Sequence, residues 1–460
     1  MNALLVLVVV LGAAGILPAL AVARRSPVVI FLAPLIGAGL AAVAALIEFG
    51  VGGSLPADYA VVTAIANLAV IAWWLTTGRS VQVPVGPRWG WSLATVVVVL
   101  GCLVVPLNVL RVPAIGADPN TIWLTHALLA YGGHHEYLTG LQNAAYQFSN
   151  PDYPPLVPAV GALAFTFSGV GDLHLAVDLT VLLTACALGV VGTGIAAAGS
   201  GGRQPARIAG VAAAGAICVV GFAVSGVDAA DGYTDLLWAA AAVGAVIWGL
   251  VLPPGTRALT VAWICAAVAS LTKNEGLTTA LVVLALIAWR YRPLAPPGPT
   301  ARRWAERAAF VLLPALPGLT WAGLIRLLGV HDNFFSSASG EPPLTRAQAT
   351  VAGLAGHLGI APVALGVLLA GCWFLRPDRE RVRLGNPAWL WIACLGSLAI
   401  LFASYMVGRI EIHAWLLSSA SRTTTFAQVL LYSDLAIWLV IAADGVLARA
   451  DRGPADSGPS

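Results

Sequence analysis

Residues 91–112 form an apolar run, WSLATVVVVLGCLVVPLNVLRV, and a polar stretch follows at once: Pro113-Ala-Ile-Gly-Ala-Asp118-Pro-Asn-Thr-Ile-Trp123. A helix needs about 17–25 apolar residues to cross a bilayer, and this run is long enough. The polar stretch continues to residue 158 and collects carboxylates, imidazoles and aromatic rings more densely than any other segment. In a chain that mostly avoids water, we expect chemistry in this loop and a scaffold role for the rest.

The overall composition extends this pattern to the whole chain. Of its 460 residues, 59% are hydrophobic and 10% are charged, which is typical of a polytopic membrane protein. The net charge of +3 does not indicate a nucleic-acid partner, and we expect none. The six cysteines all lie inside apolar runs without a CxxC motif, so we interpret them as small buried hydrophobes.

The apolar runs predict an all-α polytopic membrane protein with about thirteen transmembrane helices. Two of the runs, residues 258–272 and 277–290, are short for a span. The tail at 451–460 is predicted to be disordered. The runs are residues 3–22, 28–48, 58–77, 91–112, 172–199, 206–226, 235–252, 258–272, 277–290, 308–330, 349–375, 388–407 and 424–447.

The arginines predict the orientation of these spans. They gather in alternate loops, and arginine-rich loops are usually cytoplasmic. The pattern is consistent if the N-terminus is extracytoplasmic and the C-terminus cytoplasmic, in a cell inner (plasma) membrane. Residues 113–171 then form an extracytoplasmic loop. If residues 155–169 were counted as a further span, every later loop would change sides. We therefore expect them to form a juxtamembrane helix along the outer face.

Four further motifs fall on the same predicted face. They read Asn150-Pro-Asp152-Tyr153-Pro-Pro-Leu, Asp231-Gly-Tyr233-Thr-Asp235, Leu271-Thr-Lys273-Asn274-Glu275-Gly-Leu and Trp415-Leu-Leu-Ser-Ser-Ala-Ser-Arg422. Ionisable residues at such depths are costly and usually face a polar cavity or a charged partner. Lys273 is the only lysine of the chain, and an ammonium group is a compact charge suited to phosphate.

These motifs, in this order after Asp118-x4-Trp123, resemble the GT-C superfamily of polytopic glycosyltransferases. The resemblance is closest to bacterial relatives of the protein O-mannosyltransferases and aminoarabinose transferases, and it covers roughly residues 91–447. It implies a GT-C-like catalytic module at 91–450 with juxtamembrane helices in the outer loop, preceded by a three-span addition at 1–90. The large soluble C-terminal domain of many members is missing, so acceptor recognition would fall to the loops.

The resemblance also implies roles for individual residues. Asp118 would be the catalytic base, and Lys273 and Arg422 would bind the donor phosphate. Nucleotide sugars are cytoplasmic, so an outward-facing enzyme needs a polyprenyl-phosphate sugar donor; its acceptor would be an envelope glycan, lipid or protein. One attack assisted by one base predicts inversion at the anomeric carbon. The remaining predicted cavity residues are Trp123, Asp152, Tyr153, Asp231, Tyr233, Asp235, Asn274 and Glu275. The Ala/Arg-rich, Lys-poor composition is typical of a high-GC bacterium such as an actinobacterium.

Simpler interpretations stand beside these. Asp118 and Pro119 are a good helix N-cap pair, and Asp231 and Asp235 could cap the span that follows them. Lys273 and Arg422 could reach lipid headgroups. The protein could instead be a secondary transporter, although no inverted repeat is visible, or a non-catalytic scaffold that binds polyprenyl lipids.

The cofactor is left open, with a divalent cation as the candidate. His134, His135 and Glu136 are residue types that bind metals. Adjacent residues on one element rarely point to the same place, so a solvated loop is the favoured interpretation.

Overall fold

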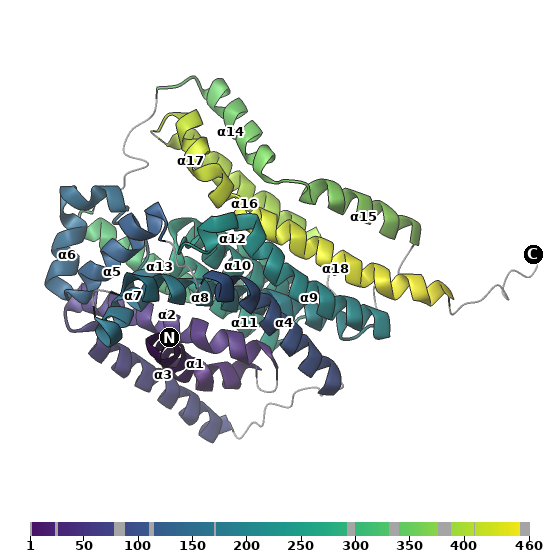
Figure 1. Cartoon of the computed structure of the whole chain (residues 1–460), viewed down its shortest axis with the longest axis horizontal. Coiled ribbons are helices and arrows are strands. Elements are labelled where there is room, and N and C mark those ends of the chain that lie inside the picture. The colour runs from purple at the N-terminus through teal and green to yellow at the C-terminus, as the bar shows by residue number, and fades with distance from the viewer. Residues whose placement is uncertain are drawn as a thin grey trace, which may run out of the picture.

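The computed structural model describes residues 2–23, 26–77, 88–109, 115–169, 172–291, 300–330, 340–375, 388–408 and 410–450, and every regular element in these ranges is helical. Figure 1 shows their arrangement. Elements η1 and η4 are π-helices, and η2 and η3 are 3₁₀-helices. In chain order the helices are α1 (Asn2–Ala23), α2 (Val28–Val51), α3 (Leu55–Thr77), α4 (Arg88–Val109), η1 (Pro119–Leu124), α5 (Thr125–Tyr131), α6 (His134–Gln142), η2 (Ala144–Ser149), α7 (Leu156–Ser168), α8 (Leu173–Gly199), α9 (Gln204–Ser225), η3 (Gly226–Ala229), α10 (Asp235–Val246), η4 (Ile247–Val251), α11 (Thr256–Thr272), α12 (Asn274–Arg290), α13 (Thr300–Leu327), α14 (Pro343–His357), α15 (Ala361–Leu375), α16 (Ala388–Val407), α17 (Ile412–Thr423) and α18 (Thr425–Ala450).

The structure is that of a polytopic helical membrane protein, but the expected thirteen spans are not confirmed. Among the described residues, eight helices are long and apolar enough to cross a bilayer, or nine if α14 and α15 count as one bent span. The expected run at 349–375 is in fact this pair, which bends by 65°. The run at 235–252 is α10 continued by η4, and α11 and α12 are shorter than a typical span.

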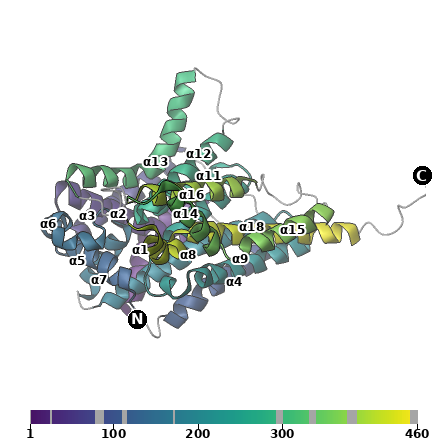
Figure 2. The same cartoon turned by 90° about the horizontal axis from the view of Figure 1, so that it is seen from above.

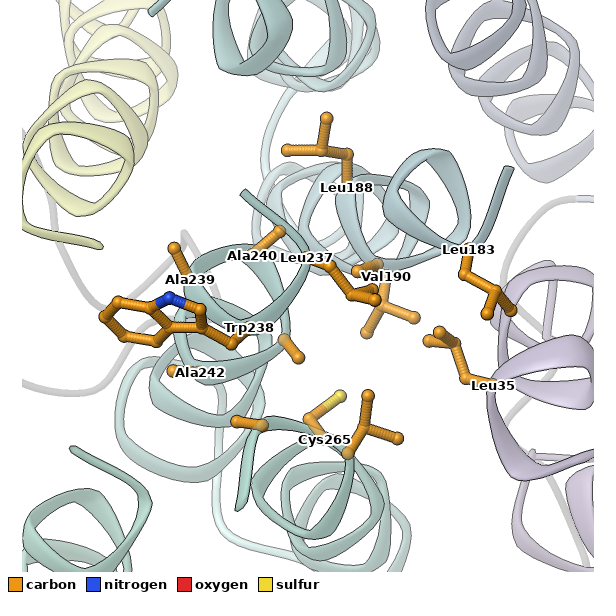
Figure 3. Packing of buried hydrophobic residues seen from close by; sticks show 14 of the residues in the cluster. Leu35, Leu183, Leu188, Val190, Leu237, Trp238, Ala239, Ala240, Ala242 and Cys265 are labelled. Carbon is orange, nitrogen blue, oxygen red and sulfur yellow. The ribbon is translucent and has the colours of Figure 1, made fainter. Parts of the chain in front are cut away.

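Helix α10 lies at the centre of the bundle. All twelve of its residues are buried, and it packs against α8, α11, α12 and α18. Its sequence, DLLWAAAAVGAV, is apolar on every side after the first residue, as expected for a helix with no exposed face. Figure 3 shows Leu237 beside Val190 of α8, and the Trp238 ring on the other side of α10.

The N-terminal helices belong to the same hydrophobic core. Helix α2 packs against α7, α8, α11 and α13 as well as against α1. Helices α1 and α2 cross at two glycines: a Cβ at Gly15 would lie 2.1 Å from the Ala33 carbonyl oxygen, and one at Gly37 2.1 Å from that of Leu11. Such close backbone approach is how small residues join membrane helices. That residues 1–90 are an addition to a catalytic module stays a prediction.

The predicted juxtamembrane helix at 155–169 is present as α7, and its surroundings are protein. Residues 156 to 165 are all buried, and α7 packs against α2, α5 and α8. An interfacial helix has one polar face, whereas α7 is apolar all round and is enclosed for that reason.

The two ends of the central helices differ in chemistry. Asp235 begins α10 and Asn274 begins α12 at one end, while Arg290 ends α12 at the other and donates to the carbonyl oxygens of Gly249 (2.9 Å) and Leu252 (2.9 Å). Figures 1 and 2 both show α15 and α18 side by side along one edge of the bundle. Helix α18 begins beside the Asp235 end, directly after α17.

Candidate functional site

A cavity of about 350 Å³ lies at the end of the bundle where α10 and α12 begin. Five separate parts of the chain form its wall: η1, the residues around Asn150, the start of α12, the end of α16, and α17. It is lined by Asp118, Thr121, Ile122, Phe148, Asn150, Asp152, Tyr153, Lys273, Asn274, Glu275, Thr278, Leu401, Ser404, Tyr405, Ile410, Trp415, Ser418, Ser419, Arg422 and Thr423.

Asp118 is held in this cavity by the Asp231-Gly-Tyr-Thr-Asp235 motif. The Gly116 amide donates to the Asp231 carbonyl oxygen (3.1 Å), and the Asp118 amide donates to the Tyr233 hydroxyl at 3.5 Å. The Asp118 side chain makes no capping hydrogen bond to η1 and forms an ion pair with Arg422 instead. The interpretation of Asp118 as a residue that caps the following helix with its side chain is therefore not supported.

Arg422 lies in the last turn of α17 and makes three kinds of contact. Its Nη1 pairs with an Asp118 oxygen, its Nη2 donates to the Ser418 carbonyl oxygen (2.9 Å), and its guanidinium lies 5.2 Å from the centre of the Tyr233 ring. The Arg422 and Asp118 side chains are 19% and 31% exposed, so this pair borders the cavity.

Lys273 occupies the break between α11 and α12, where its extended backbone separates the two helices. Its Nζ lies 2.7 Å from Asp235 Oδ1 and 3.5 Å from Glu275 Oε1, and 5.5 Å from the centre of the Tyr153 ring. The Lys273 and Asp235 side chains are only 7% and 6% exposed. Burial lowers the pKa of Lys273, but the neighbouring carboxylates of Asp235 and Glu275 outweigh it and hold this pKa above its usual value.

The residues after Asn150 complete this side of the wall. Tyr153 stacks on Trp123 with ring centres 5.3 Å apart. Asp152 accepts a hydrogen bond from Asn274 Nδ2 on its side chain (2.5 Å) and one from Trp321 Nε1 on its carbonyl oxygen (2.8 Å). Burial is the main cause that raises the pKa of Tyr153, so its hydroxyl stays neutral.

The sequence-predicted residues therefore divide into two groups. Those that line the cavity are Asp118, Asp152, Tyr153, Lys273, Asn274, Glu275 and Arg422. Those that stand outside its lining are Trp123, Asp231, Tyr233 and Asp235. Three of the second group support the first: Trp123 backs Tyr153, Tyr233 holds Asp118, and Asp235 pairs with Lys273.

The candidate metal residues are elsewhere, at the start of α6. His134 Nδ1 is hydrogen-bonded to the Glu48 carbonyl oxygen at 2.7 Å, which ties α6 to α2. Within the described ranges, no three His, Cys, Asp or Glu side chains gather closely enough to bind a metal ion together. His134, His135 and Glu136 thus do not form such a group in that part of the chain.

Sequence reasoning missed the hydroxyl groups that α16 and α17 contribute. The Tyr405 hydroxyl is hydrogen-bonded to Ser419 Oγ (2.8 Å) and Thr423 Oγ1 (3.0 Å), and all three residues line the cavity. Buried Arg346 of α14 supports this wall by donating to the carbonyl oxygens of Tyr405 (2.5 Å) and Ile410 (3.0 Å). Ser404-Tyr405 at the end of an apolar run was the available signal.

No family model, curated protein or solved structure matches the chain.

Proposed function

We propose that the protein is a membrane glycosyltransferase of GT-C type that uses a polyprenyl-phosphate sugar, with Asp118 as the general base. The observation that carries the proposal is the meeting of a carboxylate and two cations, Asp118, Arg422 and Lys273, in one cavity at one end of an apolar bundle. Asp118 and Arg422 are 304 residues apart in the sequence, so the fold has to bring them together.

The size and lining of the cavity fit a phosphosugar. A volume of about 350 Å³ is within the range of small-molecule sites. Tyr153 and Trp415 offer ring surfaces and the Ser404–Tyr405–Ser419 region offers hydroxyls, which are the groups that a sugar binds. The apolar donor tail would remain among the membrane helices, as such a tail requires.

The chemistry then follows from charge. Asp118 takes the proton of the acceptor hydroxyl as that oxygen attacks the anomeric carbon. The bond from the anomeric carbon to the phosphate oxygen breaks, and polyprenyl phosphate leaves with the electron pair. Arg422 stabilises the negative charge that develops on this leaving group. Lys273 lies in the same wall. Attack opposite to the leaving group inverts the anomeric centre.

The test is sugar transfer by purified protein in proteoliposomes that contain a panel of polyprenyl-phosphate sugars. Release of polyprenyl phosphate and the acceptor product are measured together by mass spectrometry. Asp118→Asn keeps the side-chain shape but removes the base, so turnover should fall at least about a hundredfold. Asp172→Asn is the matched control, because Asp172 is not part of the cavity lining and caps α8 through the Leu175 amide (3.1 Å).

Two results would count against the proposal. Wild-type protein that transfers no sugar from any donor would favour the scaffold or transporter interpretations, which uptake assays in the same vesicles separate. Turnover by Asp118→Asn at the wild-type rate would remove Asp118 from the mechanism.

A further inference from the structure

The two cations of the cavity have carboxylate partners in different surroundings. Lys273 and Asp235 are both almost completely buried, whereas Arg422 and Asp118 are 19% and 31% exposed. Displacing Asp235 would remove the nearest partner of a buried cation, which is strongly unfavourable. Displacing the partner of a partly exposed cation is less unfavourable, because water or a ligand can replace it.

We propose that Arg422 exchanges partners: Asp118 pairs with its guanidinium before the donor binds, the phosphate of the donor then displaces Asp118, and Lys273 keeps Asp235. The inference rests on the proposed function, which supplies the phosphate. From the sequence, Arg422 and Lys273 have the same phosphate-binding role, whereas the exchange gives them different ones. Arg422 binds phosphate directly, and Lys273 is a positioning residue for the wall around Tyr153.

The geometry of Arg422 suits such an exchange. Its Nη2 bond to the Ser418 carbonyl oxygen and its contact with the Tyr233 ring hold the guanidinium in place when Asp118 leaves. Guanidinium has five N–H donors, and phosphate matches their planar arrangement at two of them. The Asp118 backbone stays fixed through its amide and through Gly116, so the carboxylate needs only to rotate towards the acceptor.

The exchange has a functional consequence. While Arg422 holds Asp118, one carboxylate oxygen is engaged by the guanidinium and the side chain is directed towards Arg422 instead of towards an acceptor. Donor binding frees it, so the base becomes active only when there is a sugar to transfer. This order protects the cavity from unproductive chemistry.

The exchange predicts that removing Asp118 strengthens phosphate binding. The probe is geranyl monophosphate, titrated calorimetrically into purified protein in nanodiscs. Because Asp118 no longer competes for Arg422, Asp118→Asn should bind the probe about tenfold more tightly than wild type, the worth of one charge-assisted contact. Arg422→Ala should lose measurable binding.

Asp228→Asn is the control for a general change of charge. Asp228 borders a neighbouring pocket with Arg422 and feels its charge, but it is not the partner that occupies the guanidinium. Its removal should alter affinity less than about threefold, since only a longer-range interaction is lost. If Asp118→Asn does not elute as folded protein, Asp118→Ser removes the same charge with a smaller side chain.

The outcomes are distinguishable from those of the proposed function. Equal or weaker probe binding by the Asp118 variants, or no binding by any protein, would overturn the exchange. Unchanged affinity together with Asp118-dependent sugar transfer would overturn the exchange and leave the enzyme proposal standing. Tighter binding without any sugar transfer would support the exchange and count against the enzyme.

Discussion

The buried pair between Lys273 and Asp235 allows a sharp test of how the cavity is held together. Both side chains are at most 7% exposed and their charged atoms lie 2.7 Å apart. Removing one member leaves the other charge buried, which typically costs about 3–5 kcal/mol. We therefore expect Lys273→Met alone to lower the free energy of unfolding by this amount, and Asp235→Asn alone to lower it by less, because Glu275 Oε1 remains 3.5 Å from Lys273 Nζ. Lys273→Met adds the loss of the Tyr153 contact, about 1 kcal/mol.

The double variant Lys273→Met/Asp235→Asn should be more stable than either single variant, because neither charge remains to be compensated. A coupling of at least about 2 kcal/mol between the two changes is expected for groups in direct contact. The assay is reversible unfolding in mixed micelles titrated with SDS, followed by tryptophan fluorescence. Single variants within about 0.5 kcal/mol of wild type, which is the usual scatter for surface substitutions, would refute the positioning role of Lys273.

Three further outcomes follow from other contacts. A Cβ at Gly116 would lie 2.4 Å from a Tyr233 ring carbon, so Gly116→Ala should shift Asp118 and lower sugar turnover about tenfold or more. Gly12→Ala is the control and should leave turnover unchanged, because a Cβ at Gly12 has open space around it. Burial lowers the pKa of His126 from 6.5 to about 4, so the unfolded chain binds the proton more tightly than the folded chain. The free energy of unfolding should therefore fall as the pH drops from about 6.5 to about 4. In His126→Gln, the melting temperature should lose this part of its pH dependence. If the arginines set the topology, an impermeant thiol reagent applied outside cells should label Gln142→Cys and spare Thr300→Cys in a cysteine-free background; the reverse pattern would contradict the outward-facing site.

The class of the fold and part of the cavity lining could be predicted from the sequence. Long apolar runs mark membrane helices because the bilayer sets their length. Charged motifs at the ends of such runs had to share a cavity or a partner, and Lys273, Asp152 and Arg422 do line one. The number of membrane spans was harder to predict, because α11 and α12 are too short to be distinguished from interior helices by hydropathy.

The sequence did not show which cation pairs with which carboxylate. Nothing in it says that Arg422 contacts Asp118 while Lys273 contacts Asp235, since these depend on how α17 and α10 pack. Tyr405 and Arg346 were missed for the same reason: each acts through contacts with α17 or with the residues just before it. The helices that enclose α7, namely α2, α5 and α8, could likewise not be identified from its own residues.

The break at Lys273 also has a geometric consequence. The segments Asp235–Val251 and Thr256–Thr272 and helix α12 each span 17 residues, whereas α8 spans 27. At 1.5 Å per residue these are about 26 Å and 40 Å of helix. The middle of the bundle therefore contains helical segments about 15 Å shorter than α8, against which α10 packs. One added turn in α11 would move Lys273 by about 5.4 Å along the helix axis, which is roughly a third of that difference.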